Sequence, residues 1–383
     1  MTIPMYVGPR SKSPYMGNTP GINDGDDDYP IEHYAGHIHD LCRDQNGCRY
    51  LQRKLDEGNP VATALIFQEL APHFSRLMTD PFGNYLCQKM IECCTKEQRE
   101  DVLRRIGRDL VSVSMNVHGT RAVQKIIDYV DTKNEVDSIR TAFKPNIVIL
   151  IQDPNSNHVI QRCLHKLSFQ DKQFIYDAVT EGNNLVSIAT HRHGCCVLQR
   201  CIDHASTSQK LQVVNDVIKH VLTLVQDQFG NYVVQYVLDL NIANVPKRIA
   251  ENLKGLFVNL STQKFSSNVV EKIMQSGSQE AVAIIVAELI AYPEIATLLQ
   301  DPYANYVIQT ALVRSSEKQH KELADKIIPH LSVLRNTPYG KRIQAKIYRT
   351  GGPNGGAGGG SGGGNGSMGG NGHYGGGSSR SKK

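Results

Sequence analysis

A short segment returns eight times along this 383-residue chain at nearly constant spacing. Its pattern is Asp, any residue, an aromatic residue, Gly or Ala, two variable residues, Val, any residue and Gln. Successive copies lie 36 to 38 residues apart. A period of this length is typical of a solenoid, in which each repeat packs only against its neighbours. The last residues of the eight copies are Gln52, Gln88, Gln124, Gln161, Gln199, Gln235, Glu271 and Gln309.

Polar positions inside the segment vary from copy to copy. The residue four before the last one is Asn in four copies and a small side chain in the other four. The only copy that ends in Glu, at Glu271, carries Ser267 at this position. A repeat with a purely structural role has no reason to vary at polar positions. We therefore interpret the variation as the mark of a surface that recognises something varied.

Composition places the chain among ordinary soluble proteins, with 40% hydrophobic residues, 21% charged residues and a net charge of +5. This charge permits binding to a polyanion without requiring it. The nine cysteines contain no CxxC pair, and we expect them to be reduced in a cytoplasmic protein. The most apolar long stretch, residues 281–292, includes Glu288 and is too short to span a bilayer. We therefore expect no membrane segment.

Three regions of the chain differ in composition. Residues 1–30 are rich in Pro, Gly, Ser, Asn and Asp and are predicted to be extended or disordered. Residues 31–350 hold the repeats, and apolar residues recur there at helical spacing, as in Val245, Ile249 and Leu253. Residues 351–383 form a Gly/Ser/Asn tract that is predicted to be flexible. The sequence thus predicts an all-α repeat domain between two irregular segments.

Each repeat carries a predicted helix start. A capping side chain precedes a proline in Asp80-Pro81, Asp153-Pro154, Asp301-Pro302 and Thr337-Pro338, and a proline is well tolerated in the first turn of a helix. Residues four apart then lie on one helix face, which places the two variable polar positions of each repeat together. A ninth, imperfect copy has Ala345 where Gln is expected, and we interpret it as a terminal cap. Residues 31–41 are predicted to cap the other end.

These motifs resemble the pumilio-homology (PUF) family of RNA-binding proteins over about residues 31–350. The most specific segments are 227–235, 265–271 and 301–309. The resemblance implies a right-handed superhelical α-solenoid of crescent shape, built from eight three-helix repeats with degenerate capping units. It also implies that the inner face binds single-stranded RNA in antiparallel orientation, with one base for each repeat and the last repeat on the 5′ base.

In the family pattern two side chains of each repeat contact the base edge and the residue after the first of them stacks on the base. Asn with Gln suits uracil, Ser with Glu suits guanine, and a small residue with Gln suits adenine. The implied edge–stack–edge sets are Cys48, Arg49 and Gln52; Asn84, Tyr85 and Gln88; Thr120, Arg121 and Gln124; Asn157, His158 and Gln161; Cys195, Cys196 and Gln199; Asn231, Tyr232 and Gln235; Ser267, Asn268 and Glu271; and Asn305, Tyr306 and Gln309.

Taken from the eighth repeat backwards, these sets predict the sequence 5′-UGUAUAUA-3′. Two positions depart from the family pattern. Thr120 replaces the usual Cys or Ser, and Cys196 replaces a stacking Arg or aromatic residue. Because Cys196 offers no planar surface for a base, we expect tolerance of other bases, or of one extra turned-out base, just after UGUA.

The resemblance further implies binding to mRNA 3′ untranslated regions and post-transcriptional repression or mRNA decay by a monomer, with a deadenylase complex or other repressor proteins on the outer surface. An alternative is an α-solenoid scaffold of HEAT or armadillo type that binds a protein or peptide. A further alternative is a nucleolar PUF relative with relaxed specificity. His191, His193 and Cys195 have no second ligand pair at zinc spacing, and no catalytic group stands out, so we expect neither a cofactor nor an enzyme.

Overall fold

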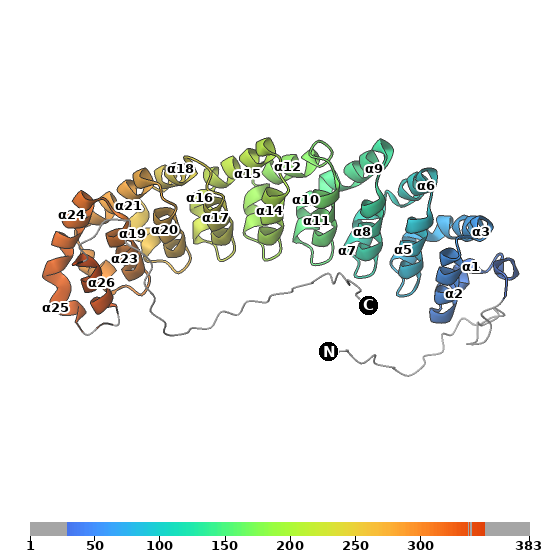
Figure 1. Ribbon diagram of the computed structural model, residues 1–383, viewed down its shortest axis with the longest axis horizontal. Helices are drawn as coiled ribbons and strands as arrows, with labels where there is room; N and C mark the ends of the chain where they lie inside the picture. The colour runs from blue at the N-terminus through green and yellow to red at the C-terminus, as the bar shows by residue number, and fades with distance from the viewer. Residues whose placement is uncertain (1–28, 336, 338, 349–383) are drawn as a thin grey trace, which may run out of the picture.

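The chain forms a crescent of stacked helices (Figure 1). The computed structural model describes residues 29–335, 337 and 339–348. The predicted irregular segments 1–30 and 351–383 therefore lie outside the described residues, apart from Tyr29 and Pro30. Every regular element within the described ranges is a helix, which confirms the predicted all-α fold. None of these helices is long and apolar enough to cross a bilayer.

The helices come in successive sets of three, which we number as repeats 1 to 8. The sets are α1 Ile38–Leu41, α2 Gln45–Asp56 and α3 Pro60–Leu70; α4 Phe74–Met78, α5 Gly83–Cys93 and α6 Lys96–Ile106; α7 Leu110–Met115, α8 Gly119–Tyr129 and α9 Lys133–Phe143; α10 Ile147–Gln152, α11 Asn157–Lys166 and α12 Gln173–Thr180; α13 Asn184–Ala189, α14 Gly194–Asp203 and α15 Thr207–Lys219; α16 Val221–Gln226, α17 Gly230–Asp239 and α18 Val245–Asn252; α19 Phe257–Ser261, α20 Ser266–Gln275 and α21 Gln279–Ala291; and α22 Ile295–Gln300, α23 Ala304–Arg314 and α24 Glu317–Ile327.

The second helix of each set lies on the concave side of the crescent and the third on the convex side (Figure 1). Each second helix contacts the second helix of the next set, from α2 through α23. We call these the inner helices and the third helices the outer helices. Short 3₁₀ helices, at Ala71–His73 and Lys144–Asn146, precede α4 and α10. The stack therefore presents a continuous curved row of inner helices on one side.

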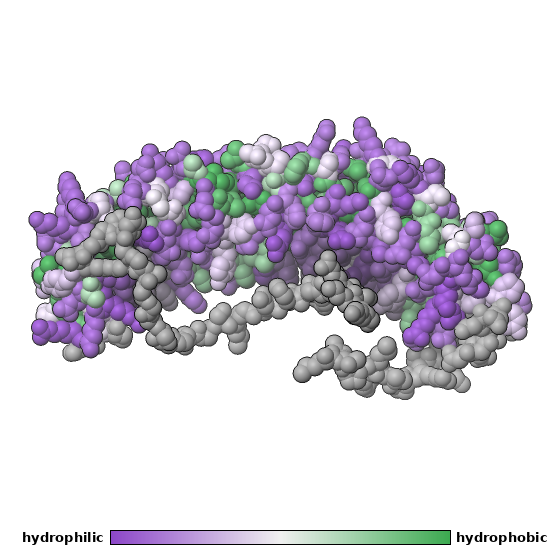
Figure 2. All heavy atoms as spheres, in the orientation of Figure 1, coloured by the Kyte–Doolittle hydropathy of each residue, from purple (hydrophilic) through white to green (hydrophobic). Residues whose placement is uncertain are grey.

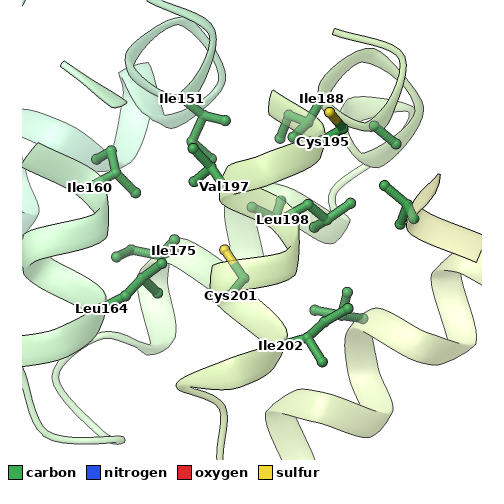
Figure 3. Packing of buried hydrophobic residues seen from close by; sticks show 14 of the residues in the cluster. Ile151, Ile160, Leu164, Ile175, Ile188, Cys195, Val197, Leu198, Cys201 and Ile202 are labelled. Carbon is green, nitrogen blue, oxygen red and sulfur yellow. The ribbon is translucent and has the colours of Figure 1, made fainter. Parts of the chain in front are cut away.

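The core is one continuous layer of aliphatic side chains between neighbouring repeats. Figure 3 shows Leu198 and Cys201 of α14 among residues of repeat 4 such as Ile160 and Leu164. All four are fully buried, and burial of a side chain such as Leu198 contributes about 1.5–3 kcal/mol. Because the apolar contacts lie between repeats, each repeat is stabilised by its neighbours. The surface in Figure 2 is mostly hydrophilic, with separated hydrophobic patches.

Five of the eight outer helices, α6, α9, α15, α21 and α24, begin at Ser or Thr caps. Thr95, Thr132 and Ser206 each accept a hydrogen bond from a backbone N–H three residues later, and the Gln or Glu at that later position bonds back to the cap residue's N–H. This reciprocal capping box satisfies two N–H groups that the helix itself leaves unpaired, and such a cap contributes about 1 kcal/mol.

Inner helices begin differently from the prediction. Asp80, Asp153 and Asp301 do accept hydrogen bonds from the N–H groups two and three residues later, at 2.8–2.9 Å. The regular helix, however, begins only at the third or fourth residue after the Asp, so the proline lies in a turn before the helix. The Asp-Pro prediction was thus right about the bonds and wrong about the first helical residue. Pro338 itself lies outside the described residues.

Both ends of the array are covered. A 3₁₀ helix, Ile31–Tyr34, precedes α1, and the ring of Tyr34 packs edge-on against Tyr50 of α2 at 5.3 Å between centroids. At the other end a 3₁₀ helix, Ile328–His330, and α25 Leu331–Leu334 lead to α26 Gly340–Ile347, which packs against α23. The Tyr339 hydroxyl donates to the Gln300 carbonyl oxygen at 2.8 Å.

Candidate nucleic-acid interface

The predicted base-contacting residues occupy the same three places on every inner helix. The first edge residue is buried in all eight repeats, the stacking residue after it is exposed, and the second edge residue is partly or fully buried. In repeat 6 the exposed fraction is 2% for Asn231 and 59% for Tyr232. The fold thus brings all eight predicted sets to one concave surface, in the order of the chain.

In the four Asn repeats the edge residues are held by one another. The Nε2 group of the Gln donates to the Oδ1 atom of the Asn at 2.9–3.1 Å in Asn84–Gln88, Asn157–Gln161, Asn231–Gln235 and Asn305–Gln309. The Asn Nδ2 group donates in turn to the carbonyl oxygen of the residue four before it, at 2.8 Å in each case. The Asn amide is therefore fixed, and it fixes the Gln amide.

The orientation of these amides determines what they offer to a ligand. Since the Asn Nδ2 group donates to backbone oxygen, the Gln of repeats 2, 4 and 6 supplies a free Oε1 acceptor and the second hydrogen of Nε2. In repeat 8 the Gln309 Oε1 atom already accepts a bond from Lys346 Nζ at 3.2 Å. An adjacent donor and acceptor suit the mixed edge of uracil.

Repeats 1 and 3 replace Asn with a small side chain. The Cys48 thiol donates to the Phe82 carbonyl oxygen at 3.2 Å, and the Thr120 hydroxyl donates to the Asn155 carbonyl oxygen at 3.0 Å, so both bonds reach the next repeat. Gln52 donates to the Cys48 sulfur at 3.1 Å. Gln124 donates to the Thr120 hydroxyl at 3.2 Å. In both repeats the Gln side chain is therefore held by a hydrogen bond, although the side chain beside it is smaller than Asn.

Repeat 5 is organised differently. The Cys195 thiol bonds to the Arg192 carbonyl oxygen of its own turn at 3.6 Å, and burial raises its pKa to about 12. Gln199 makes no side-chain hydrogen bond within the described part of the chain. Cys196 is exposed at the stacking position. Repeat 5 therefore has the least fixed set of the eight.

Repeat 7 carries the only acidic edge residue. Burial raises the pKa of Glu271, while a hydrogen bond from Thr310 and the positive charge of Lys346 oppose that rise. The Thr310 hydroxyl donates to Glu271 Oε2 at 2.8 Å. Ser267, four residues earlier, is buried. The site thus offers a second carboxylate oxygen that only accepts hydrogen bonds, which suits the adjacent N–H donors of guanine.

The stacking residues differ in chemical character. Tyr85, Tyr232 and Tyr306 are largely exposed rings. Partial desolvation and the nearby Arg121 lower the pKa of His158, which favours the neutral form of its ring. Asn268 donates to the Lys264 carbonyl oxygen at 3.0 Å, and Arg49 and Arg121 are exposed. Planar rings and guanidinium groups can both stack on a base.

The Gly or Ala position of the repeat pattern helps to place this surface, a role that the pattern itself did not predict. At the start of the inner helix most repeats carry Gly, and a Cβ atom on Gly194 would lie 2.2 Å from the Ile188 carbonyl oxygen. The helix therefore packs tightly on the turn before it. In repeats 4 and 7 the same position is Ser156 or Ser266, whose hydroxyl donates to the corresponding carbonyl oxygen at 2.9 or 2.7 Å. The recurrence of small residues (Gly, Ser or Ala) at this position of every repeat was the available signal.

No group of three or more His, Cys, Asp or Glu side chains within residues 29–348 is placed to hold a metal ion. The His191 ring instead accepts hydrogen bonds from the backbone N–H groups of His193 and Gly194, at 3.3 and 3.4 Å. It thus takes the place of the Asp that accepts such bonds in repeats such as 2, 4 and 8. Its role is to start the inner helix α14. The geometry therefore defines an α-helical repeat protein with a polar recognition surface on its concave face.

Comparison with known proteins gives this class a family. The model of the Pumilio-family RNA binding repeat matches residues 37–71, 73–106, 109–139, 146–180, 184–218 and 220–241. The model of the NOP9-like PUF repeat domain matches residues 254–350. The chain belongs to the pumilio (PUF) family of RNA-binding repeat proteins, as the sequence motifs predicted.

Curated relatives with similar sequences are also pumilio proteins. A pumilio domain-containing protein of Schizosaccharomyces pombe is 48% identical over 309 residues, which cover 81% of this chain and 45% of that protein. The putative pumilio homolog 7 of Arabidopsis thaliana is 44% identical over 80% of this chain and 47% of its own length. The chain thus spans about half the length of these curated relatives.

Solved structures show the same architecture. The Puf4 RNA-binding domain bound to an HO endonuclease RNA 3′ UTR recognition sequence is 42% identical, with a TM-score of 0.69, over 82% of this chain and 99% of that chain. The RNA-binding domain of yeast Puf5p bound to AAT2 RNA is 32% identical, with a TM-score of 0.76, over 84% of this chain and 97% of that chain. Their RNA ligands are consistent with a binding role, not a catalytic one, for this family.

Proposed function

We propose that this protein binds single-stranded RNA in a sequence-specific manner, with each repeat contacting one base on the concave face. The observation that carries the proposal is the edge pair of repeat 7. Ser267 and Glu271 occupy the same buried and half-buried places as Asn231 and Gln235 of repeat 6. A groove for a peptide has no need of this one exchange, whereas a guanine among uracils does.

The proposed preferred sequence is 5′-UGUAUAUA-3′, bound antiparallel to the repeats. The first three bases are assigned to repeats 8, 7 and 6, in each of which the Gln or Glu side chain has a hydrogen-bond partner within the protein. Such preorganisation lowers the entropy that binding must offset. The fourth base is assigned to repeat 5, where Gln199 has no such partner among the described residues, and we expect weaker discrimination there.

We further propose that the RNA targets lie in mRNA 3′ untranslated regions and that binding leads to translational repression or mRNA decay in the cytoplasm. Support comes from the Puf4 domain, which was solved with a 3′ UTR recognition sequence. A deadenylase complex or other repressor proteins bound to the convex face would cause this repression or decay. We propose that the protein acts as a monomer.

The test is a competition binding assay with UGUAUAUA and its single-base variants. Wild-type protein should lose on the order of a hundredfold in affinity when the second base is changed from G to U, because charge-assisted hydrogen bonds contribute about 1.5–3 kcal/mol each. The double variant S267N/E271Q should prefer U at that base and leave the other positions unchanged.

A matched control is the variant Glu92→Gln, which removes a carboxylate from an inner helix outside the edge positions. It should keep the preference for G at the second base. Equal affinity of the wild-type protein for all second bases would refute the proposal and favour a protein-binding solenoid.

A further inference from the structure

Lys346 of the terminal unit contacts the recognition set of repeat 8. It lies on α26, directly after Ala345, which stands where the other units carry their second edge residue. The Lys346 Nζ group donates to the Gln309 Oε1 atom at 3.2 Å, while Gln309 Nε2 donates to the Asn305 Oδ1 atom at 3.1 Å. The unit that was predicted to be only a cap therefore adds a charged side chain to this set.

The helix that carries Lys346 is packed firmly against repeat 8. The two ring nitrogens of His320, on α24, lie 2.7 and 3.2 Å from the carbonyl oxygens of Leu312 and Ile347, and so connect the end of α23 with the end of α26. Ile343 and Ile347 of α26 are buried, and Lys346 itself is partly buried. The ammonium group is thus carried by a packed helix.

Gln309 is the only second edge residue of the eight repeats that is buried. Its exposed fraction is 4%, whereas the corresponding residues of repeats 1 to 7 are partly exposed. Any donor that bonds to Gln309 Oε1 also comes close to Lys346 Nζ, because that nitrogen is only 3.2 Å from the same oxygen. A base at repeat 8 therefore meets the lysine together with the Gln.

At the same place in other repeats a lysine is bound to an acid instead. For repeat 6 the lysine is Lys272, which pairs with Asp239, and for repeat 2 it is Lys125, which pairs with Glu92 at 2.7 Å. Both acids lie four residues after the Gln of the repeat. In repeat 8 that position is Val313. Repeat 8 therefore lacks the carboxylate that engages the other lysines.

The lysine completes a set of groups that matches uracil. The Watson–Crick edge of uracil presents an acceptor, a donor and an acceptor, at O2, N3–H and O4, whereas a Gln amide offers one acceptor and one donor. Lys346 adds a second donor beside the acceptor Gln309 Oε1. An ammonium group carries three N–H bonds, so its bond to Gln309 does not exhaust it.

Resting on the proposed function, we infer that Lys346 is a third base-reading residue of repeat 8, which donates to one carbonyl oxygen of the uracil while Gln309 binds N3–H and the other. Cytosine presents an acceptor at N3 and an amino donor at C4, so two of the three contacts would be lost. Repeat 8 should therefore select U over C more strictly than repeats 2, 4 and 6.

The first test compares the affinities for UGUAUAUA and CGUAUAUA, which differ only in the first base. Wild-type protein should prefer U about ten- to hundredfold, because cytosine leaves a charge-assisted donor unpaired. Lys346→Met has a side chain of similar length without the charge and should lower this preference about tenfold. Burial raises the pKa of Glu271 and the charge of Lys346 opposes this rise, so binding is measured at pH 8, which favours the ionised carboxylate in both proteins.

Lys272→Met is the matched control, because it makes the same change at the same place of another repeat. It should leave the preference for U over C unchanged at the first and third bases. Lys346→Met should also keep the wild-type preference at the third base, which separates a lost base contact from a general loss of structure. Lys346→Arg keeps a charged donor and should retain most of the preference at the first base.

A second measurement needs only the wild-type protein and so remains informative if Lys346→Met is unstable. 2-Thiouridine and 4-thiouridine replace O2 or O4 with sulfur, a weaker acceptor. At the first base each should weaken binding by about threefold or more, because both oxygens accept a bond. At the third base only one of the two should do so, since Gln235 offers one donor and Asn231 Nδ2 donates to backbone oxygen.

The outcomes separate the two hypotheses. If UGUAUAUA is preferred over its second-base variants but Lys346→Met changes the U over C preference at the first base no more than Lys272→Met does, the reading role of Lys346 is refuted and the proposed function stands. The same follows if only one of the two thiouridines weakens binding at the first base. If the second-base variants bind as tightly as UGUAUAUA, the proposed function is refuted and the role of Lys346 with it.

Discussion

Repeats 5 and 6 are adjacent and share one backbone, yet they differ in how firmly their recognition residues are held. In repeat 6 Asn231 fixes Gln235 at 2.9 Å and Tyr232 stands exposed beside them. In repeat 5 the corresponding Gln199 has no hydrogen-bond partner among the described residues, and the stacking position is Cys196. The difference shows that the solenoid sets where recognition residues lie, whereas local side-chain chemistry sets how well they are preorganised.

The largest difference in RNA affinity between repeats 5 and 6 should appear when the residue at the stacking position of each is replaced by Ala. Tyr232→Ala should cost about 2 kcal/mol of binding free energy, roughly thirtyfold in affinity for UGUAUAUA, because a base loses its aromatic platform. Cys196→Ala should change the affinity by less than about twofold. Fluorescence anisotropy with labelled RNA measures both. Equal losses in the two variants would show that repeat 5 grips its base as firmly as repeat 6.

Transplanting the edge pair of repeat 5 into repeat 6 should alter specificity. Asn231→Cys removes the acceptor that orients Gln235 and leaves space beside it. The third base should then shift from U toward A, by about 1.5 kcal/mol or roughly tenfold, which is the net contribution of a hydrogen bond to a ligand. Selection from an RNA pool randomised at the third base measures the shift. Asn231→Gln serves as the control that keeps an amide.

A stacking side chain introduced into repeat 5 should strengthen the binding of RNA there. Cys196→Arg supplies a planar guanidinium at an exposed position and should strengthen binding by about 1 kcal/mol, roughly fivefold. Cys196→Ser, which is similar in size and not planar, should have little effect. Isothermal titration with both variants distinguishes stacking from a change in size. A gain with Ser as large as with Arg would contradict the stacking explanation.

Repeat 7 should make the RNA affinity depend on pH, which the repeats with a Gln at this position should not do. Burial raises the pKa of Glu271, and the proposed contact with guanine requires the ionised carboxylate. Affinity for UGUAUAUA should therefore be full well above that pKa and decline as the pH falls through it, by at most about tenfold for each pH unit. Glu271→Gln should remove this dependence, since no proton competes at the amide. Titrating binding from pH 7 to pH 4.5 with both proteins is the measurement, and parallel curves would contradict it.

Much of the fold could be predicted from the chain alone. A 36–38-residue period, helical spacing such as that of Val245 and Ile249, and turn residues before each inner helix sufficed for an all-α repeat array. The places of the predicted base-contacting residues on the inner helices also followed from the repeat register, because residues four apart share a helix face. The base assignments and the biological outcome remain predictions.

Local sequence could not define the first residue of the inner helices. Asp80 bonds to the N–H groups of Phe82 and Gly83 in a turn, and the helix starts only where the chain packs on the preceding turn. At Gly194 the Ile188 carbonyl oxygen comes so close that a side chain there would collide with it. Both effects depend on how the first and second helices of a repeat meet, which the capping pattern does not contain.

The sequence by itself determined the repeat, the helical class and the alternation of polar side chains along the inner helices, because these depend on spacing within a single helix. Only the tertiary structure decided which residues of neighbouring repeats touch. Thr310 reaches Glu271 across 39 residues, and Arg162 reaches Asp128 across 34, whereas Arg200 turns to its own helix. The physical reason is that the rotation between successive repeats brings these side chains together, and that rotation arises from core packing rather than from any one segment.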